Sequence, residues 1–173
     1  MTDTSTPTEQ IPVRVFGGPT ALIEYGGLRF LTDPAFDAPG EYPRGNGHVL
    51  TKTAPAAIAA AELGPVDVVL LSHDEHPDNL DHSGRALLAD VPLVLTTHGG
   101  AGRLGGTART ALFDGALLTL DSAQAAEAAI VLAARRVVPA HFDSWGHFTE
   151  GRTHLVAAFT AAGLLDRLEL ASA

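Results

Sequence analysis

The sequence contains no cysteine, and this absence excludes several kinds of chemistry at once. Disulfides, thiolate nucleophiles and cysteine-type zinc sites are all ruled out, so histidine and carboxylate are the only strong metal ligands available. A cytoplasmic location is the default expectation for a chain without disulfides.

Basic residues are also scarce: 11 Lys and Arg stand against 20 Asp and Glu, for a formal net charge of −9. Proteins that bind nucleic-acid backbones usually display a basic stripe, and none is visible here. We therefore expect no nucleic-acid partner. A small-molecule substrate remains the expectation, because a metal centre can attract even an anionic one locally.

Long apolar runs are missing as well. No segment reaches the roughly 18 consecutive apolar residues of a membrane span. The first ten residues have neither the charged start nor the hydrophobic centre of a secretory signal, so we expect no membrane partner. With 173 residues, 46% of them apolar, the chain can bury one sizeable core, which predicts a single domain over residues 1–173.

The N-terminal part has the pattern of an antiparallel β-unit. Residues 11–16 and 20–25 have strand composition, and Gly26-Gly27 is a two-residue hairpin signal before a third strand at residues 28–31. Residues 33–53 are rich in Pro and Gly and predict a long loop.

Helices and strands are expected to alternate over the rest of the chain. An alanine-rich helix should begin at Pro55 and end near Gly64. Asp121 and Gln124 have the spacing of a capping box. The pattern predicts strands at residues 66–71, 92–96, 137–140 and 167–170, and helices at residues 81–89, 121–135 and 150–162. This alternation indicates βαβ units and an α/β fold.

The chemistry-bearing segment is residues 72–81, which hold two histidines, four carboxylates and an asparagine directly after the predicted strand at residues 66–71. Pro77 disfavours the helical region for His76, so we expect a loop in which neighbouring side chains can turn toward one centre. Such a set of nitrogen and oxygen ligands indicates a divalent metal site. The alternative is a polar loop in which Asp81 caps a helix and the other carboxylates are solvated.

Three histidines, His73, His98 and His141, lie within two residues of the end of a predicted strand. Ligands of open α/β sheets collect outside the carboxyl ends of the strands, so the three could converge. For His141 an ordinary hydrogen-bonding role is an even alternative. His98 is expected in a supporting or turn role.

A glycine-rich segment offers a different interpretation. Residues 100–105 satisfy the pattern G-x-G-x-x-G after a predicted strand, as in dinucleotide-binding sites. However, Gly105-Gly106 is a poor helix start, and too little chain follows for the rest of such a domain. A flexible glycine-rich turn is the better interpretation.

Two motifs carry a resemblance to a known family. They are Leu-Leu-Ser-His73-Asp-Glu-His76-Pro-Asp78-Asn79-Leu-Asp81 and Val-Pro-Ala-His141-Phe-Asp-Ser-Trp145-Gly-His147-Phe. With the Leu-Thr-Asp33-Pro34 that ends the hairpin unit, the sequence resembles metallo-β-lactamase-fold hydrolases, particularly the branch that includes L-ascorbate-6-phosphate lactonase. The resemblance implies an αββα sandwich. The chain between Arg109 and Asp121 is too short for the strand pair that the family has there, which implies a reduced version of that sandwich.

The resemblance also suggests ligands. The family motif is His-x-His-x-Asp-His, whose first two histidines bind one metal and whose Asp and last His bind a second. His76 and Asp78 match it, whereas His73 and Asp74 compete for its first position and Asn79 replaces its last histidine. By the same resemblance, His141 matches the family's final ligand.

The function implied is metal-dependent hydrolysis of a small ester, lactone or phosphoester. Imidazole ligands favour zinc, with manganese or iron left open by the carboxylates. Asp78 would orient the attacking water or accept its proton, and His147 or His98 would protonate the leaving group. The alternative is a degenerate, inactive member that acts as a binding or oligomerising module. A truncated sheet would expose an edge through which a homodimer could form.

Overall fold

The predicted antiparallel unit is present in the computed structural model, which describes residues 11–44, 47–112 and 120–170. Strands β1 (Val13–Gly17), β2 (Thr20–Tyr25) and β3 (Leu28–Thr32) pair in sequence order. Gly26 and Gly27 have φ angles of 60° and 78°, which glycine adopts without a steric cost, so they close the hairpin as expected.

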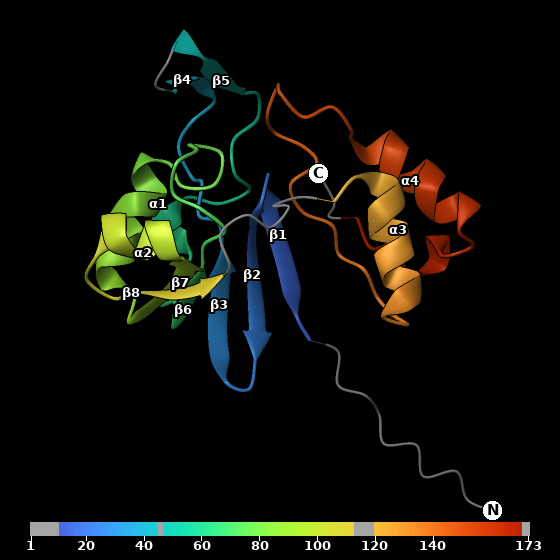
Figure 1. The fold of residues 1–173 in the computed structure, drawn as a ribbon, viewed down its shortest axis with the longest axis horizontal. Helices are drawn as coiled ribbons and strands as arrows, with labels where there is room; N and C mark the ends of the chain where they lie inside the picture. Colours follow the sequence, from blue (N-terminus) through green and yellow to red (C-terminus); the bar gives the residue numbers. More distant parts are fainter. Residues whose placement is uncertain (1–10, 45–46, 113–119, 171–173) are drawn as a thin grey trace, which may run out of the picture.

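Three parallel strands extend this unit into one six-stranded sheet in the order β1-β2-β3-β6-β7-β8. They are β6 (Val68–Leu70), β7 (Leu93–Thr97) and β8 (Ala108–Leu112). Helices α1 (His82–Leu87) and α2 (His98–Leu104) connect them and lie beside this part of the sheet (Figure 1). The α/β class is thereby confirmed.

The C-terminal part contributes a pair of helices, α3 (Ser122–Val131) and α4 (Arg152–Ala161), which lie on the β1 side of the sheet (Figure 1). Asp121 and Gln124 form the predicted capping box at the start of α3. The helix ends earlier than residue 135. The strands expected at residues 137–140 and 167–170 are wrong.

The physical reason is that these two segments have little to pair with. Among the described residues, the two segments share a single parallel β-bridge, between Val137 and Leu168. The chain just before Leu168 forms a 3-10 helix, Leu165–Arg167. Within the described ranges, the C-terminal part therefore contributes this one β-bridge and the helices α3 and α4 where a full sandwich would have a second sheet.

Two other predictions are corrected. The segment at residues 33–53 is not a loop throughout, because β4 (Gly40–Pro43) and β5 (Val49–Lys52) form a two-stranded ribbon. The helix expected between Pro55 and Gly64 is only a 3-10 turn, Ala60–Glu62. Its backbone bonds elsewhere: the Ala57 amide donates to the Phe16 carbonyl at 2.7 Å, which ties the segment to β1.

Residues 100–105 are not a flexible turn. Gly100 and Gly102 lie inside α2, which begins because the Thr97 hydroxyl accepts the Gly100 amide at 3.0 Å. Added to Gly100, a Cβ would lie 2.8 Å from Thr96 Oγ1, so this glycine permits close packing of the helix on β7. Glycines within a helix do not form the loop that a dinucleotide phosphate needs.

Two apolar clusters support the fold. The larger packs the sheet against its connections and is centred on Leu31, Val69 and Leu71. The smaller lies between α3 and α4 and is centred on Phe159. None of the helices among the described residues has the length and hydrophobicity of a membrane span.

Candidate active site

A cavity of about 730 Å³ lies where the loop after β6 meets the segment at residues 137–150. Its wall joins parts of the chain that are distant in sequence. The polar residues that line it include Asp33, His73, His76, Asp78, Asn79, His141 and His147.

The loop at residues 72–81 faces this cavity because a tight turn shapes it. The His76 carbonyl accepts the amides of Asn79 and Leu80 at 3.0 and 2.9 Å. Asp81 then caps α1 by accepting the Gly84 amide at 2.8 Å. The loop predicted from Pro77 is thus confirmed, and the helix cap proposed for Asp81 is also present.

Asp78 is the centre of the site. Its side chain is buried, with 3% exposed, and its Oδ2 lies 3.3 Å from His141 Nε2 and 3.2 Å from His147 Nε2. Burial alone would raise the pKa of Asp78, but the hydrogen bond from His141 and the charges of both histidines outweigh it and lower that pKa. Asp78 is therefore a carboxylate at neutral pH.

The second oxygen of Asp78 has no hydrogen-bond partner among the described residues, although it is buried. A buried carboxylate oxygen without a partner is costly unless a ligand completes its surroundings. The same is true of Asn79 Oδ1. These two acceptor atoms indicate a place where a bound ligand would complete the coordination or hydrogen bonding of the site.

His73 and His76 form a second pair, with His73 Nε2 3.0 Å from His76 Nδ1. Burial lowers the pKa of each imidazole, and the electrostatic effect of a neighbour lowers it further: His76 for His73, and the Arg44 guanidinium for His76. Neutral imidazoles are the form in which histidine binds metals. The Arg44 guanidinium contacts His76 Nε2.

Asp74 points elsewhere. Its carboxylate pairs with the Arg103 guanidinium at 2.5 Å and lies 3.8 Å from Arg85. Burial would raise the pKa of Asp74, but the Arg103 hydrogen bond and charge outweigh this and lower it. Of the two residues that compete for the first motif position, His73 lines the cavity and Asp74 does not.

His141 is held in an unusual backbone conformation, with φ of 64°. Non-glycine residues enter this left-handed region at an energetic cost, which the surroundings must offset. Here the His141 amide donates to the Gly18 carbonyl at 2.6 Å, and the Gly18 amide donates to Asp143 Oδ1 at 3.0 Å. The turn between β1 and β2 thus fixes the histidine.

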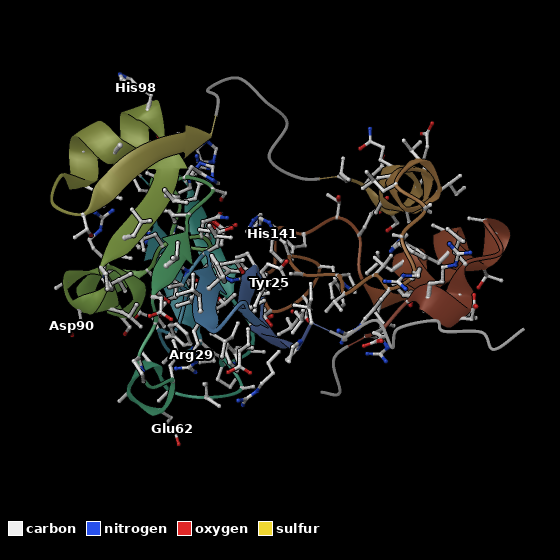
Figure 2. All side chains as sticks on the ribbon, turned by 90° about the horizontal axis from the view of Figure 1, so that it is seen from below. Tyr25, Arg29, Glu62, Asp90, His98 and His141 are labelled. Atoms are coloured by element: carbon white, nitrogen blue, oxygen red, sulfur yellow. The ribbon has the colours of Figure 1, made fainter. Side chains whose placement is uncertain are left out.

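His98 is the strand-end histidine that the fold does not bring to the cavity. It is the exposed first residue of α2. Figure 2 shows it well away from His141, which lies near the middle of the molecule beside the sheet. Of the three histidines predicted to follow strands, His73 and His141 line the cavity and His98 does not.

Asp33 is a site residue that the sequence reasoning missed as a candidate. Its Oδ1 accepts the Ser72 amide at 2.6 Å, which joins the end of β3 to the loop after β6. Burial raises the pKa of Asp33 to about 6, against the lowering effect of the Ser72 hydrogen bonds. The signal was available: a Thr-Asp-Pro sequence directly after a strand.

The donor atoms do not converge on one point. In the described part of the chain, no group of three or more His, Asp and Glu side chains is arranged to hold a metal ion. Instead the side chains hydrogen-bond in two sets, His73 with His76 and Asp78 with His141 and His147. The chemistry of the donors nevertheless suits a divalent ion, and Asp78 has an oxygen to spare.

Comparisons with known proteins show the fold. No family model and no curated protein matches the sequence. The structure is similar to an isothiocyanate hydrolase from Delia radicum gut bacteria, with TM-score 0.71 and 15% identity, over 92% of this chain and 96% of that one.

It is also similar to a protein described as a possible metal-dependent hydrolase from Veillonella parvula. That match has TM-score 0.73 and 8% identity, over 94% of this chain and 97% of the other. Both similarities span nearly the whole of each chain. The likeness in fold therefore extends over nearly the whole chain.

Proposed function

We propose that this protein is a metal-dependent hydrolase of a small ester, lactone or phosphoester. The observation that carries the proposal is the buried Asp78, which contacts two histidines from a distant segment and keeps one oxygen without a partner among the described residues. Two proteins of the same fold carry the word hydrolase in their names, which supports this reaction class. The resemblance to metallo-β-lactamase-fold enzymes supports it as well.

His73, His76, Asp78 and His141 would hold the ion, because they supply imidazole and carboxylate donors to one cavity. Binding would displace the contact between His73 and His76 and that between His76 and Arg44. A divalent ion at this place would lower the pKa of a water molecule toward about 7. Zinc suits the imidazoles, and manganese or iron would be accepted through the carboxylate.

The chain's own groups have distinct tasks. The two histidines keep Asp78 ionised, so its carboxylate can orient the attacking water and is free to accept a proton from it. His147 contacts the same carboxylate oxygen from the open side, with 38% of its side chain exposed. It is therefore placed to pass a proton to a leaving group in the cavity.

The proposal is tested by metal analysis of protein purified without chelators. We expect about one or more transition-metal ions per chain, and a rise in the midpoint of thermal unfolding when zinc or manganese is added. His76→Ala should lose the metal and this rise. The matched control is His98→Ala, which removes an exposed histidine outside the cavity and should keep both.

Hydrolysis is then measured on model esters, lactones and phosphodiesters with each metal. Loss of activity in His76→Ala but not in His98→Ala would support the proposed site. A stably folded wild-type protein that neither takes up metal nor hydrolyses any of these compounds would contradict the proposal. It would favour the alternative of an inactive binding or oligomerising module.

A further inference from the structure

The lining of the cavity has two unlike parts. One carries the histidines and carboxylates described above. The other, the apolar wall, comes from the C-terminal part of the chain, through Ala125, Val137, Phe142, Phe148, Leu155 and Phe159. Within this apolar wall, the Phe148 ring contacts the rings of His141 and His147. A volume of about 730 Å³ falls in the range of pockets that enclose a whole small molecule, so both parts of the lining contact what binds there.

The charges of the lining are negative. Asp33, Asp78, Asp121 and Glu150 all line the cavity, and no Lys or Arg does so within the described ranges. The Arg44 guanidinium contacts His76, but Arg44 is not itself one of the residues that line the cavity. A phosphate group entering the cavity would therefore meet four carboxylates, and apart from the proposed metal ion and the histidines it would find no guanidinium or ammonium group in the described lining to bind it.

The N-terminus of helix α3, a place that ordinarily attracts anions, is already occupied. The ten-residue helix α3 begins at the cavity, and helix N-termini favour anionic groups. Its first amide, on Ser122, donates to Glu150 Oε2 at 2.8 Å. The Gln124 amide donates to Asp121 Oδ1 at 2.7 Å. The protein's own carboxylates thus take the place that a substrate anion would need.

From these observations we propose that the substrate is an uncharged ester or lactone whose apolar substituent lies against α3 and α4, and that phosphorylated compounds are excluded. This inference rests on the proposed hydrolase function and narrows it. In the reaction, the oxygen of water forms a bond to the acyl carbon and the ester C–O bond breaks. The proton of the water goes to the departing alkoxide, which leaves an acid and an alcohol.

The substrate class is tested with 4-nitrophenyl acetate, 4-nitrophenyl hexanoate and 4-nitrophenyl phosphate, on protein loaded with zinc or manganese. Each methylene buried against the apolar wall should raise kcat/KM about fourfold. Hexanoate has four more methylenes than acetate, so we expect its kcat/KM to exceed that of the acetate by about 250-fold, and no hydrolysis of the phosphate. This comparison uses the wild-type chain alone.

Ala125→Phe tests the wall itself, because the added ring would fill the cavity beside α3. It should reduce the hexanoate-to-acetate ratio about tenfold or more. The control, Ala123→Phe, places the same ring at an exposed position of the same helix that does not line the cavity and should leave the ratio unchanged. Both variants are compared with wild type by thermal unfolding.

A binding measurement separates the two proposals. N-phenylhexanamide has the shape of an apolar ester but resists hydrolysis, and its affinity is measured by titration calorimetry. If the amide binds to wild type and not to Ala125→Phe while no ester is hydrolysed, the proposed hydrolase function is contradicted and the proposed apolar binding site is supported. If the phosphate is the preferred substrate, or if the acetate and hexanoate react equally and the amide does not bind, the inference is overturned.

Discussion

The two parts of the molecule, residues 11–112 and residues 120–170, hold their site residues in different ways. In the first part, the sheet and its connections fix the loop: Asp33 accepts the Ser72 amide, and Asp81 caps α1. In the second part, His141 and His147 lie on a segment without helix or strand. The first part is a framework that positions its own site residues, whereas the site residues of the second part are positioned by contacts with the first.

That docking is made by a few backbone hydrogen bonds to β-elements of the first part. The amides of Thr53 and Gly146 bond to the carbonyls of Ser144 and Thr51, each at 2.8 Å, and the His141 amide bonds to Gly18. Trp145 is buried, and its backbone forms an isolated antiparallel β-bridge with Lys52. The position of Asp78 is therefore set by local structure, whereas the positions of its two histidines depend on long-range contacts.

The largest expected effect comes from truncating each core in turn. Phe159→Ala should reduce the free energy of unfolding by about 3–5 kcal/mol and Leu31→Ala by about 2–5 kcal/mol, because both side chains are fully buried. If the two parts form the single domain predicted from the sequence, each variant will shift one common transition in chemical unfolding. Two separate transitions, one moved by each variant, would show two independent units.

The framework can be disturbed at one glycine. A Cβ at Gly84 in α1 would lie 1.9 Å from the Pro34 carbonyl oxygen, so Gly84→Ala should cost about 3 kcal/mol or more by forcing α1 away from β3. Gly102→Ala in α2, where a Cβ meets no atom within 4 Å, is the control and should stabilise by up to about 1 kcal/mol. Equal effects of the two changes on the unfolding midpoint would refute the close contact.

The pH dependence of stability tests Asp33. Its folded pKa of about 6 lies above the ordinary 3.8, so its contribution to stability is complete below pH 4 and is lost as pH rises through 6. Asp33→Asn keeps an acceptor for the Ser72 amide but cannot ionise. Without metal, the variant should gain up to about 3 kcal/mol relative to wild type between pH 4 and pH 7. A constant difference across this range would contradict the raised pKa.

The smallest effect should come from the loop that holds His141. Asp143→Ala removes the carboxylate that accepts the Gly18 amide, while the His141 side chain itself remains. We expect kcat to fall about tenfold, with the unfolding midpoint nearly unchanged, because the histidine loses its orientation. Asp143→Asn retains an acceptor oxygen and should restore most of the activity. If Asn is as impaired as Ala, the hydrogen bond to Gly18 is not what positions His141.

Local patterns predicted much of the fold. The glycine pair of the hairpin, the Asp121–Gln124 box and the loop imposed by Pro77 each depend on a few neighbouring residues, and all three are found. The alanine-rich segment after Pro55 was predicted as a helix, but its Ala57 amide bonds to the Phe16 carbonyl of β1 and only a 3-10 turn forms after it. The C-terminal strands failed because a strand requires a partner, and apolar composition alone does not supply one.

The candidate site divides in the same way. The sequence by itself determined the kinds of side chain and their order, including His73, His76 and Asp78 in one short loop after a buried strand. Only the tertiary structure decided that Arg103 draws Asp74 away, that Asp33 joins the cavity, and that His141 and His147 reach Asp78 while His98 does not. The reason is that a composition, a cap or a turn is set by residues close in the chain, whereas convergence depends on which distant elements pack together.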